Sequence, residues 1–179
     1  MVFKKGDYMK KVYKNISFFL ILSTFILCLC ACSNNGSDGN TLKEGITLMD
    51  IVDEVDSQIG IQMPQEVNDT ILTDLYYMDM SNVETYAGKF SMTMTSCDNV
   101  VAIKAVPGKV DVVVDALKRR QQDLIDSFSH YLPEQYQKAQ AGTVIVRGDY
   151  AFLVIVGESE ETISEDMQKA EDIINSYFQ

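Results

Sequence analysis

Histidine and cysteine, which build most catalytic and metal sites, are scarce in this sequence. Its 179 residues include one His and four Cys. The sequence contains no glycine-rich phosphate loop, no calcium-loop pattern, no paired-cysteine zinc spacing and no basic stretch for nucleic acid. We therefore find no catalytic constellation, predict no cofactor and expect a protein that is not an enzyme.

Basic residues are also in short supply. The chain has 15 Lys and Arg against 26 Asp and Glu, a formal net charge of −11. Residues 1–31 hold five of the basic residues and one of the acids, so the rest carries 10 basic and 25 acidic residues, a charge of −15. Such a field disfavours nucleic acid and anionic lipid as partners, permits cationic ones, and serves solubility in any case.

The N-terminus has the three parts of a secretory signal peptide: a lysine-rich start, an apolar run and a small-residue end. The apolar run extends from Ile16 to Cys32 and ends in Leu29-Cys30-Ala31-Cys32. This ending resembles the lipobox of bacterial lipoproteins, which implies cleavage before Cys32 and acylation of its sulfur. Cys30 fits less well, because bulky Leu29 directly precedes it. The alternative is an uncleaved membrane anchor, for which a run of about 17 residues is slightly short.

Acylation of Cys32, by chains such as palmitate, would fix the protein to the extracytoplasmic face of the cell membrane. The predicted domains are then a signal peptide over 1–31, a lipidated flexible tether over 32–45 and a single α/β domain over 46–179. The tether is assigned from its Ser, Asn and Gly content. Cys97 is the other cysteine of the mature chain, so no intramolecular disulfide is expected.

Hydrophobic periodicity predicts most elements of the domain, because spacing of three or four marks helices and alternation marks half-buried strands. Capping residues and glycines mark the helix ends. In chain order the predicted elements are a helix from Thr47 to Gly60, short helices near 67–72 and 81–87, strands at 90–95 and 100–106, a long helix over 110–128, a helix from Pro133 to Gly142, two strands within 143–157, and a last helix capped by Ser159.

The main elements, in the order α-β-β-α-β-β-α, predict an α+β fold. We expect a two-layer sandwich in which helices pack on a roughly four-stranded, mostly antiparallel sheet. The last strand does not fit a simple two-layer scheme, because it is apolar on both faces: Phe152 and Val154 lie on one face, and Leu153 and Ile155 on the other. A second cover is therefore expected, from the N-terminal helix or from a partner subunit.

A set of short motifs, in fixed order, points to a known family. The motifs are Cys97-Asp98-Asn99-Val100-Val101-Ala102-Ile103-Lys104-Ala105, Gly108-Lys109-Val110, Lys138-Ala139-Gln140 and Val146-Arg147-Gly148-Asp149-Tyr150-Ala151-Phe152. Together they resemble a family of Gram-positive lipoproteins that carry the domain of unknown function numbered 4358. The similarity covers about residues 70–165. It implies the domain limits and the lipoprotein location, and no activity, substrate or catalytic residue comes with it.

The single histidine, His130, directly follows Ser129. Adjacent residues of a helix point about 100° apart, so Ser129 cannot be the nucleophile that His130 activates. The sequence also has no nucleophile elbow. The simpler interpretation is a histidine at the C-terminal end of a helix, where the dipole favours positive charge.

The sharpest metal hypothesis concerns two Met-x-Met pairs and the lone cysteine of the domain. The five candidate ligands are Met78, Met80, Met92, Met94 and Cys97. Thioether and thiolate sulfur suit copper(I). Alternation also places Met92 and Met94 on one face with Phe90, as a core would require. Cys97 has no second cysteine in a C-x-x-C motif and no basic neighbour that would activate it.

These observations favour a non-enzymatic module, tethered to the membrane through Cys32, that binds an envelope protein or supports assembly. The alternative is an envelope lipoprotein that binds a small molecule or a metal ion. A hydrolase that depends on His130 is the third class.

Overall fold

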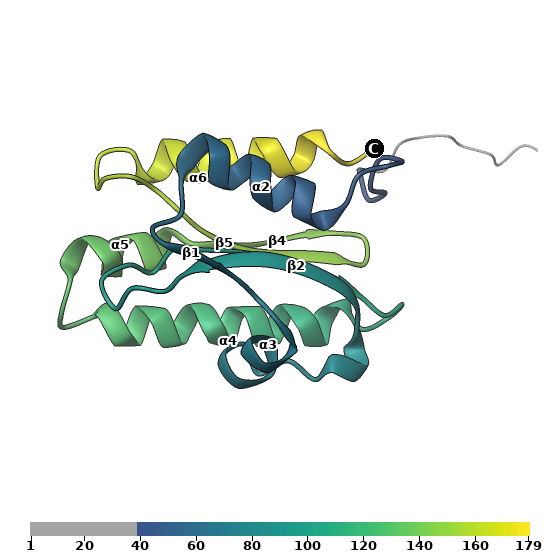
Figure 1. Ribbon diagram of the computed structural model, residues 1–179, viewed down its shortest axis with the longest axis horizontal. Coiled ribbons are helices and arrows are strands. Elements are labelled where there is room, and N and C mark those ends of the chain that lie inside the picture. Colours follow the sequence, from purple (N-terminus) through teal and green to yellow (C-terminus); the bar gives the residue numbers. More distant parts are fainter. Residues whose placement is uncertain (1–38) are drawn as a thin grey trace, which may run out of the picture. The chain divides into compact units, whose positions relative to one another are not determined.

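The computed structural model describes residues 39–179, which are built around a five-stranded antiparallel sheet (Figure 1). The strand order is β1-β2-β3-β5-β4, so the two hairpins lie side by side through β3 and β5. The strands are β1 (Pro64–Glu66), β2 (Val83–Ser91), β3 (Asn99–Ala105), β4 (Thr143–Arg147) and β5 (Tyr150–Ile155). The predicted α+β class is confirmed, with one strand more than the four expected.

Helices cover both faces of the sheet, so the fold has three layers and the two-layer prediction is wrong (Figure 1). A buried apolar cluster lies on each face, and each cluster joins sheet residues to helices. One face carries α2 (Leu48–Ile59) and α6 (Ile163–Ser176), and the other carries α3 (Asp69–Leu75), α4 (Val110–Phe128) and α5 (Pro133–Ala141).

The third layer is explained by β5. Phe152 and Val154 belong to the cluster under α2 and α6, while Leu153 and Ile155 belong to the cluster under α4. Side chains alternate between the two faces of a strand, so a strand that is apolar at every position needs a cover on each side. The chain itself supplies the second cover, through the N-terminal helix α2 together with α6.

The start of α2 is the local feature that the sequence specifies best. The Thr47 side chain accepts a hydrogen bond from Asp50 N, and the Asp50 carboxylate accepts one from Thr47 N at 2.7 Å, which completes a capping box. These hydrogen bonds from Thr47 lower the pKa of Asp50. Gly60 follows the helix with φ of 96°, in the region that favours glycine.

The segment before β3 differs from prediction. Residues 81–87 form no α-helix: a single 3-10 turn, η1 (Met80–Asn82), leads directly into β2. The strand predicted over 90–95 ends at Ser91, and β1 pairs with it from the other side. β1 escaped prediction because three polar-flanked residues show no periodicity, and it is defined by its pairing with β2 rather than by its own composition.

Both ends of the described chain also differ in detail. The N-cap of α6 is Thr162 rather than Ser159, and Ser159 lies in the preceding turn, where its carbonyl accepts hydrogen bonds from Thr162 N and Ile163 N. Leu42 pairs with Phe178 in an antiparallel bridge. Residues 40–43 therefore belong to the folded unit, which begins earlier than the predicted boundary at 46, because the C-terminal residues offer them backbone partners.

The predicted signal peptide and Cys32 lie outside the described residues. Within residues 39–179, no helix combines the length and the apolar character needed to cross a membrane.

Candidate functional site

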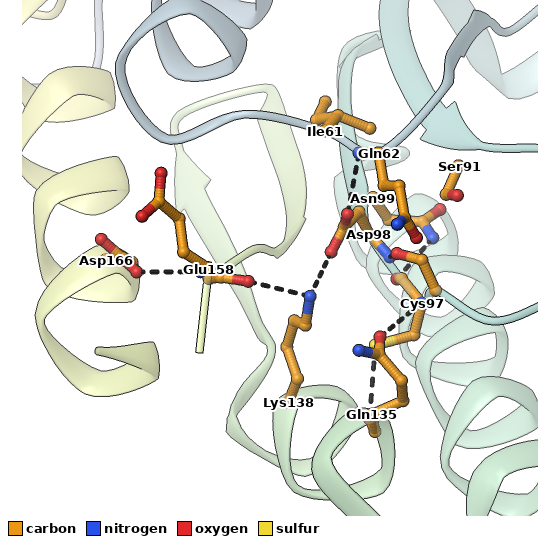
Figure 2. Close-up of polar contacts among 12 residues, drawn as sticks. Ile61, Gln62, Ser91, Cys97, Asp98, Asn99, Gln135, Lys138, Glu158 and Asp166 are labelled. Carbon is orange, nitrogen blue, oxygen red and sulfur yellow. Dashed lines mark hydrogen bonds and ion pairs between the residues drawn. The ribbon is translucent and has the colours of Figure 1, made fainter. Parts of the chain in front are cut away.

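A buried ion pair joins two segments that are distant in sequence. Lys138 Nζ lies 2.6 Å from Asp98 Oδ1, and the side chains are 8% and 6% exposed (Figure 2). Lys138 comes from α5, and Asp98 lies one residue before β3. Lysine and aspartate are almost never this buried unless they are paired, so the contact is a specific feature of the fold.

Further hydrogen bonds fix the pair from two other segments. Gln62 N, between α2 and β1, donates to Asp98 Oδ2 at 2.9 Å, and Lys138 Nζ donates to the Gly157 carbonyl at 2.9 Å (Figure 2). Gly157 has φ of 143°, and a Cβ there would lie 3.1 Å from Ile163 Cγ1. Glycine is therefore needed to hold this carbonyl over the ammonium group. Three connections of the fold and helix α5 thus meet at one charge pair.

A pocket of about 340 Å³ opens over the pair. Ile59 and Ile61 contribute apolar surface to its lining. Its polar lining comes from Gln62, Ser96, Asp98, Gln135, Lys138 and Glu158. An ammonium group has three hydrogens, of which Lys138 uses two on Asp98 and Gly157. Within residues 39–179, one hydrogen of the buried cation is thus left for a further partner.

Two other side chains of the lining also have a hydrogen-bond donor without a partner among the described residues. Gln135 Oε1 accepts from Cys97 N at 3.0 Å, whereas Gln135 Nε2 has no hydrogen-bond partner among the residues that the structure describes. The Ser96 hydroxyl oxygen accepts from Asp98 N at 3.2 Å, and its hydrogen is likewise without a partner in residues 39–179. The pocket can therefore donate hydrogen bonds from three side chains.

The residues on either side of Asp98 anchor it from within the core. Cys97 is fully buried, and its thiol donates to the Gln135 carbonyl at 3.3 Å. Burial raises the pKa of Cys97 to about 12, although Lys138 lowers it. Asn99 donates to the Cys97 carbonyl at 3.0 Å and accepts from the Tyr76 hydroxyl. Burial also raises the pKa of Tyr76, so both groups stay neutral near pH 7.

The five predicted copper ligands fall into two places. Met78 and Cys97 are buried in the cluster under α4, and Met80 packs against it. Met92 and Met94 are exposed beyond the end of β2, so they do not share the core with Phe90 as alternation suggested. The structure thus divides the five predicted ligands into a core group and an exposed group. Within residues 39–179, no three His, Cys, Asp or Glu side chains form a group that could hold a metal ion.

His130 and the two acidic residues Asp53 and Asp56 have ordinary surroundings. His130 is exposed beyond the end of α4, and the Ser129 hydroxyl donates to the Asp126 carbonyl. Asp53 and Asp56 both pair with Lys89, at 2.8 and 2.7 Å. These hydrogen bonds raise the pKa of Lys89. The two acids thus have a cation of the chain as their partner.

Sequence reasoning did not single out Asp98, Gln135 or Lys138. Two of them stood within the quoted motifs, Cys97-Asp98-Asn99 and Lys138-Ala139-Gln140, and the structure brings these two motifs together in the ion pair. No apolar residue three or four positions earlier in α5 marked Lys138 as buried, and its burial is seen only in the structure. Nothing in the spacing of 40 positions indicated its partner.

The fold and the pocket define a three-layer α+β domain with a largely polar cavity. A family model described as "Domain of unknown function (DUF4358)" matches residues 57–156, and the chain belongs to this family. The matched region begins earlier and ends earlier than the predicted 70–165, and it includes Gln62, Asp98, Gln135 and Lys138. No curated protein and no solved structure matches the chain.

Proposed function

We propose that this protein is a membrane-tethered, extracytoplasmic binding module whose pocket takes a small polar ligand. The observation that carries the proposal is the position of the Asp98–Lys138 pair, which is almost fully buried and yet lines an open pocket. Burying two charges is costly, and apolar residues of similar volume often stabilise a fold equally well. A charge pair with a spare hydrogen-bond donor at the base of a pocket therefore supports recognition.

The lining indicates the chemistry of the ligand. Lys138, Gln135 and Ser96 offer hydrogen-bond donors, and the Glu158 carboxylate offers acceptors. Lys138 offsets the charge of Asp98, so Glu158 leaves the pocket with one net negative charge. Within a domain of this acidity, a neutral, zwitterionic or cationic compound is favoured over a multiply charged anion. The volume is in the range of small-molecule sites, which begins at about 300 Å³.

Binding of an envelope protein, the role that the sequence favoured, was motivated by the tether and by an apolar sheet face without an assigned cover. Because α2 and α6 occupy that face, ligand binding takes first place.

The proposal is tested by ligand-induced stabilisation of the full-length protein in detergent. We expect amino acids or neutral sugars to raise the unfolding temperature, and citrate to leave it unchanged, since a bound ligand stabilises the folded state. Glu158→Gln should weaken binding of a zwitterion by about fivefold, corresponding to about 1 kcal/mol for one exposed charge interaction. Glu165→Gln, in the first turn of α6, is the matched control. The proposal would be refuted if Glu158→Gln and Glu165→Gln weakened binding equally, or if none of the compounds raised the unfolding temperature.

The membrane tether is tested separately by labelling. We expect cells fed an alkyne fatty acid to label the protein through Cys32, because a thiolate is the nucleophile that takes up lipid. Cys32→Ser should abolish the label and release the chain from the membrane fraction, whereas Cys28→Ala should keep both. Undiminished labelling of Cys32→Ser would contradict the assignment without affecting the pocket.

A further inference from the structure

Three methionine side chains are exposed where β1 begins and β2 ends. Met63, Met92 and Met94 are 67%, 58% and 88% exposed, whereas Met78 and Met167 are 3% and 8% exposed. A single exposed apolar residue is ordinary, but a local group of them calls for an explanation. All three have the same chemistry, a neutral and polarisable thioether.

Strand pairing places two of these residues opposite each other. β1 and β2 are antiparallel, and their register pairs Pro64 with Ser91. Met92 N donates to the Met63 carbonyl at 3.2 Å, which extends that register by one pair. Met63 and Met92 are therefore neighbours along the paired backbones, and Met94 lies two residues further on, in the turn that follows β2.

Polar contacts made by residues next to the methionines hold the two segments together. The Thr93 hydroxyl donates to Gln62 Oε1 at 3.3 Å, and Thr93 N donates to Ser91 Oγ at 3.2 Å. Met63 itself has φ of 46°, the left-handed region that non-glycine residues seldom adopt. The chain thus turns at Met63 while staying joined to the Met92–Met94 segment. The three methionines therefore lie on two segments that hydrogen bonds join at one end of the sheet.

We propose that Met63, Met92 and Met94 form a surface site for a soft monovalent metal ion, copper(I). Thioether sulfur is a soft ligand that favours copper(I) over calcium, magnesium or manganese, which prefer oxygen. Binding to a thioether displaces no proton, so the site does not need an activated group. The acidic surface of the domain attracts cations in general. An extracytoplasmic position, which belongs to the proposed tether, would expose the site to metal from outside the cell.

The proposed set differs from the one that the sequence indicated. Met78 and Cys97 are excluded by burial, and the raised pKa of Cys97 keeps its thiol protonated. Met63 enters because of strand pairing, which the sequence does not display. The three methionines do not line the Lys138 pocket, although Gln62, which does, directly precedes Met63 and accepts a hydrogen bond from Thr93. The methionine variants and Glu158→Gln therefore test the two proposals separately.

The test is a metal titration of the full-length lipidated protein in detergent. Silver(I) serves as an air-stable probe, and copper(I) is added without oxygen in competition with a chromogenic chelator. We expect one ion per chain. We expect Met63→Leu, and the double variant Met92→Leu, Met94→Leu, each to weaken binding about tenfold or more. In metal sites, loss of a contact that only supports a ligand already weakens binding about tenfold, and loss of a ligand itself should weaken it at least as much.

Leucine keeps the apolar surface and removes only the sulfur, so the variants separate metal binding from hydrophobic contact. Met49→Leu, at a partly buried position on α2, and Cys97→Ala are the controls and should bind as the parent does. Unchanged affinity in the Met63 and Met92–Met94 variants would overturn the proposal, as would a loss of binding in Cys97→Ala.

Discussion

At the scale of single residues, Lys138 and Asp98 depend on each other more than on any other group. Each carries a charge that is more than nine-tenths buried, and each has at least one further hydrogen bond. An interior charge interacts strongly with its partner, and it is costly to leave alone. The fold accommodates the two buried charges only as a pair. Removing either residue would leave the other charge buried without a partner and would lower the free energy of unfolding.

We predict that Lys138→Met lowers the free energy of unfolding by about 3–5 kcal/mol, since it leaves the Asp98 carboxylate buried without its cation. Urea unfolding, followed by circular dichroism, measures the loss. Lys104→Met is the matched control, because Lys104 pairs with Glu84 where both side chains are partly exposed, 29% and 46%. The control should change stability by about 1 kcal/mol or less. Similar losses in both variants would contradict a special role for the buried pair.

The buried thiol of Cys97 predicts how the stability of the fold depends on pH. Its pKa in the fold is about 12, raised from 9.0. The folded state therefore binds this proton more tightly than the unfolded state, and the stability from Cys97 is complete below pH 9 and is lost as pH rises toward 12. We expect Cys97 to resist alkylation by iodoacetamide at pH 8 and to react once urea unfolds the chain. Fast alkylation of the folded protein would show an accessible thiolate.

At the scale of elements, α2 combines a strong local start with a long-range role. Its capping box satisfies backbone N–H groups at the first turn, and its apolar stripe covers one face of the sheet. Gln62, shortly after its end, donates to Asp98 at the pocket. The position of α2 therefore matters for the pocket as well as for the core.

Thr47→Ala should lower the free energy of unfolding by about 1 kcal/mol, because it removes the side-chain acceptor for Asp50 N. Chemical denaturation at pH 7 measures the change. Ser57→Ala, which removes an exposed hydroxyl that donates to the Glu54 carbonyl within the same helix, provides the reference. A Thr47 variant no less stable than the Ser57 variant would mean that the capping box contributes nothing measurable.

At the scale of the whole described unit, its first and last residues are joined. Thr41 and Gln179 exchange two backbone hydrogen bonds, at 3.1 and 2.9 Å, and Lys43 N donates to the Tyr177 carbonyl at 2.9 Å. Partly buried Leu42 packs against the cluster under α2 and α6. Residues 41–43, which were predicted to belong to the tether, thus pair with the C-terminal residues of the domain.

A chain that begins at Ile46 should be less stable than one that begins at Gly39, by about 1–3 kcal/mol, because it lacks these hydrogen bonds and the Leu42 contact. Thermal and urea unfolding of the two chains measure the difference. Equal stability would show that residues 39–45 add nothing to the fold, and would return the domain boundary to residue 46.

The sequence by itself determined the features that depend on near neighbours. The helix that starts at Thr47, the long helix over 110–128 and the two strands within 143–157 follow from spacing within one turn or one strand pair. The two apolar faces of β5 also indicated a second cover. These patterns report local periodicity and burial, which are written in consecutive residues.

Only the tertiary structure decided which distant residues meet. Asp98 and Lys138 are 40 positions apart, and their contact depends on the packing of α5 beside the start of β3. The exposure of Met92 and Met94 depends on β2 ending at Ser91, although alternation continues beyond it. β1 exists because β2 offers a free edge. In each case the deciding free energy lies in contacts between separate elements, which no local pattern of residues contains.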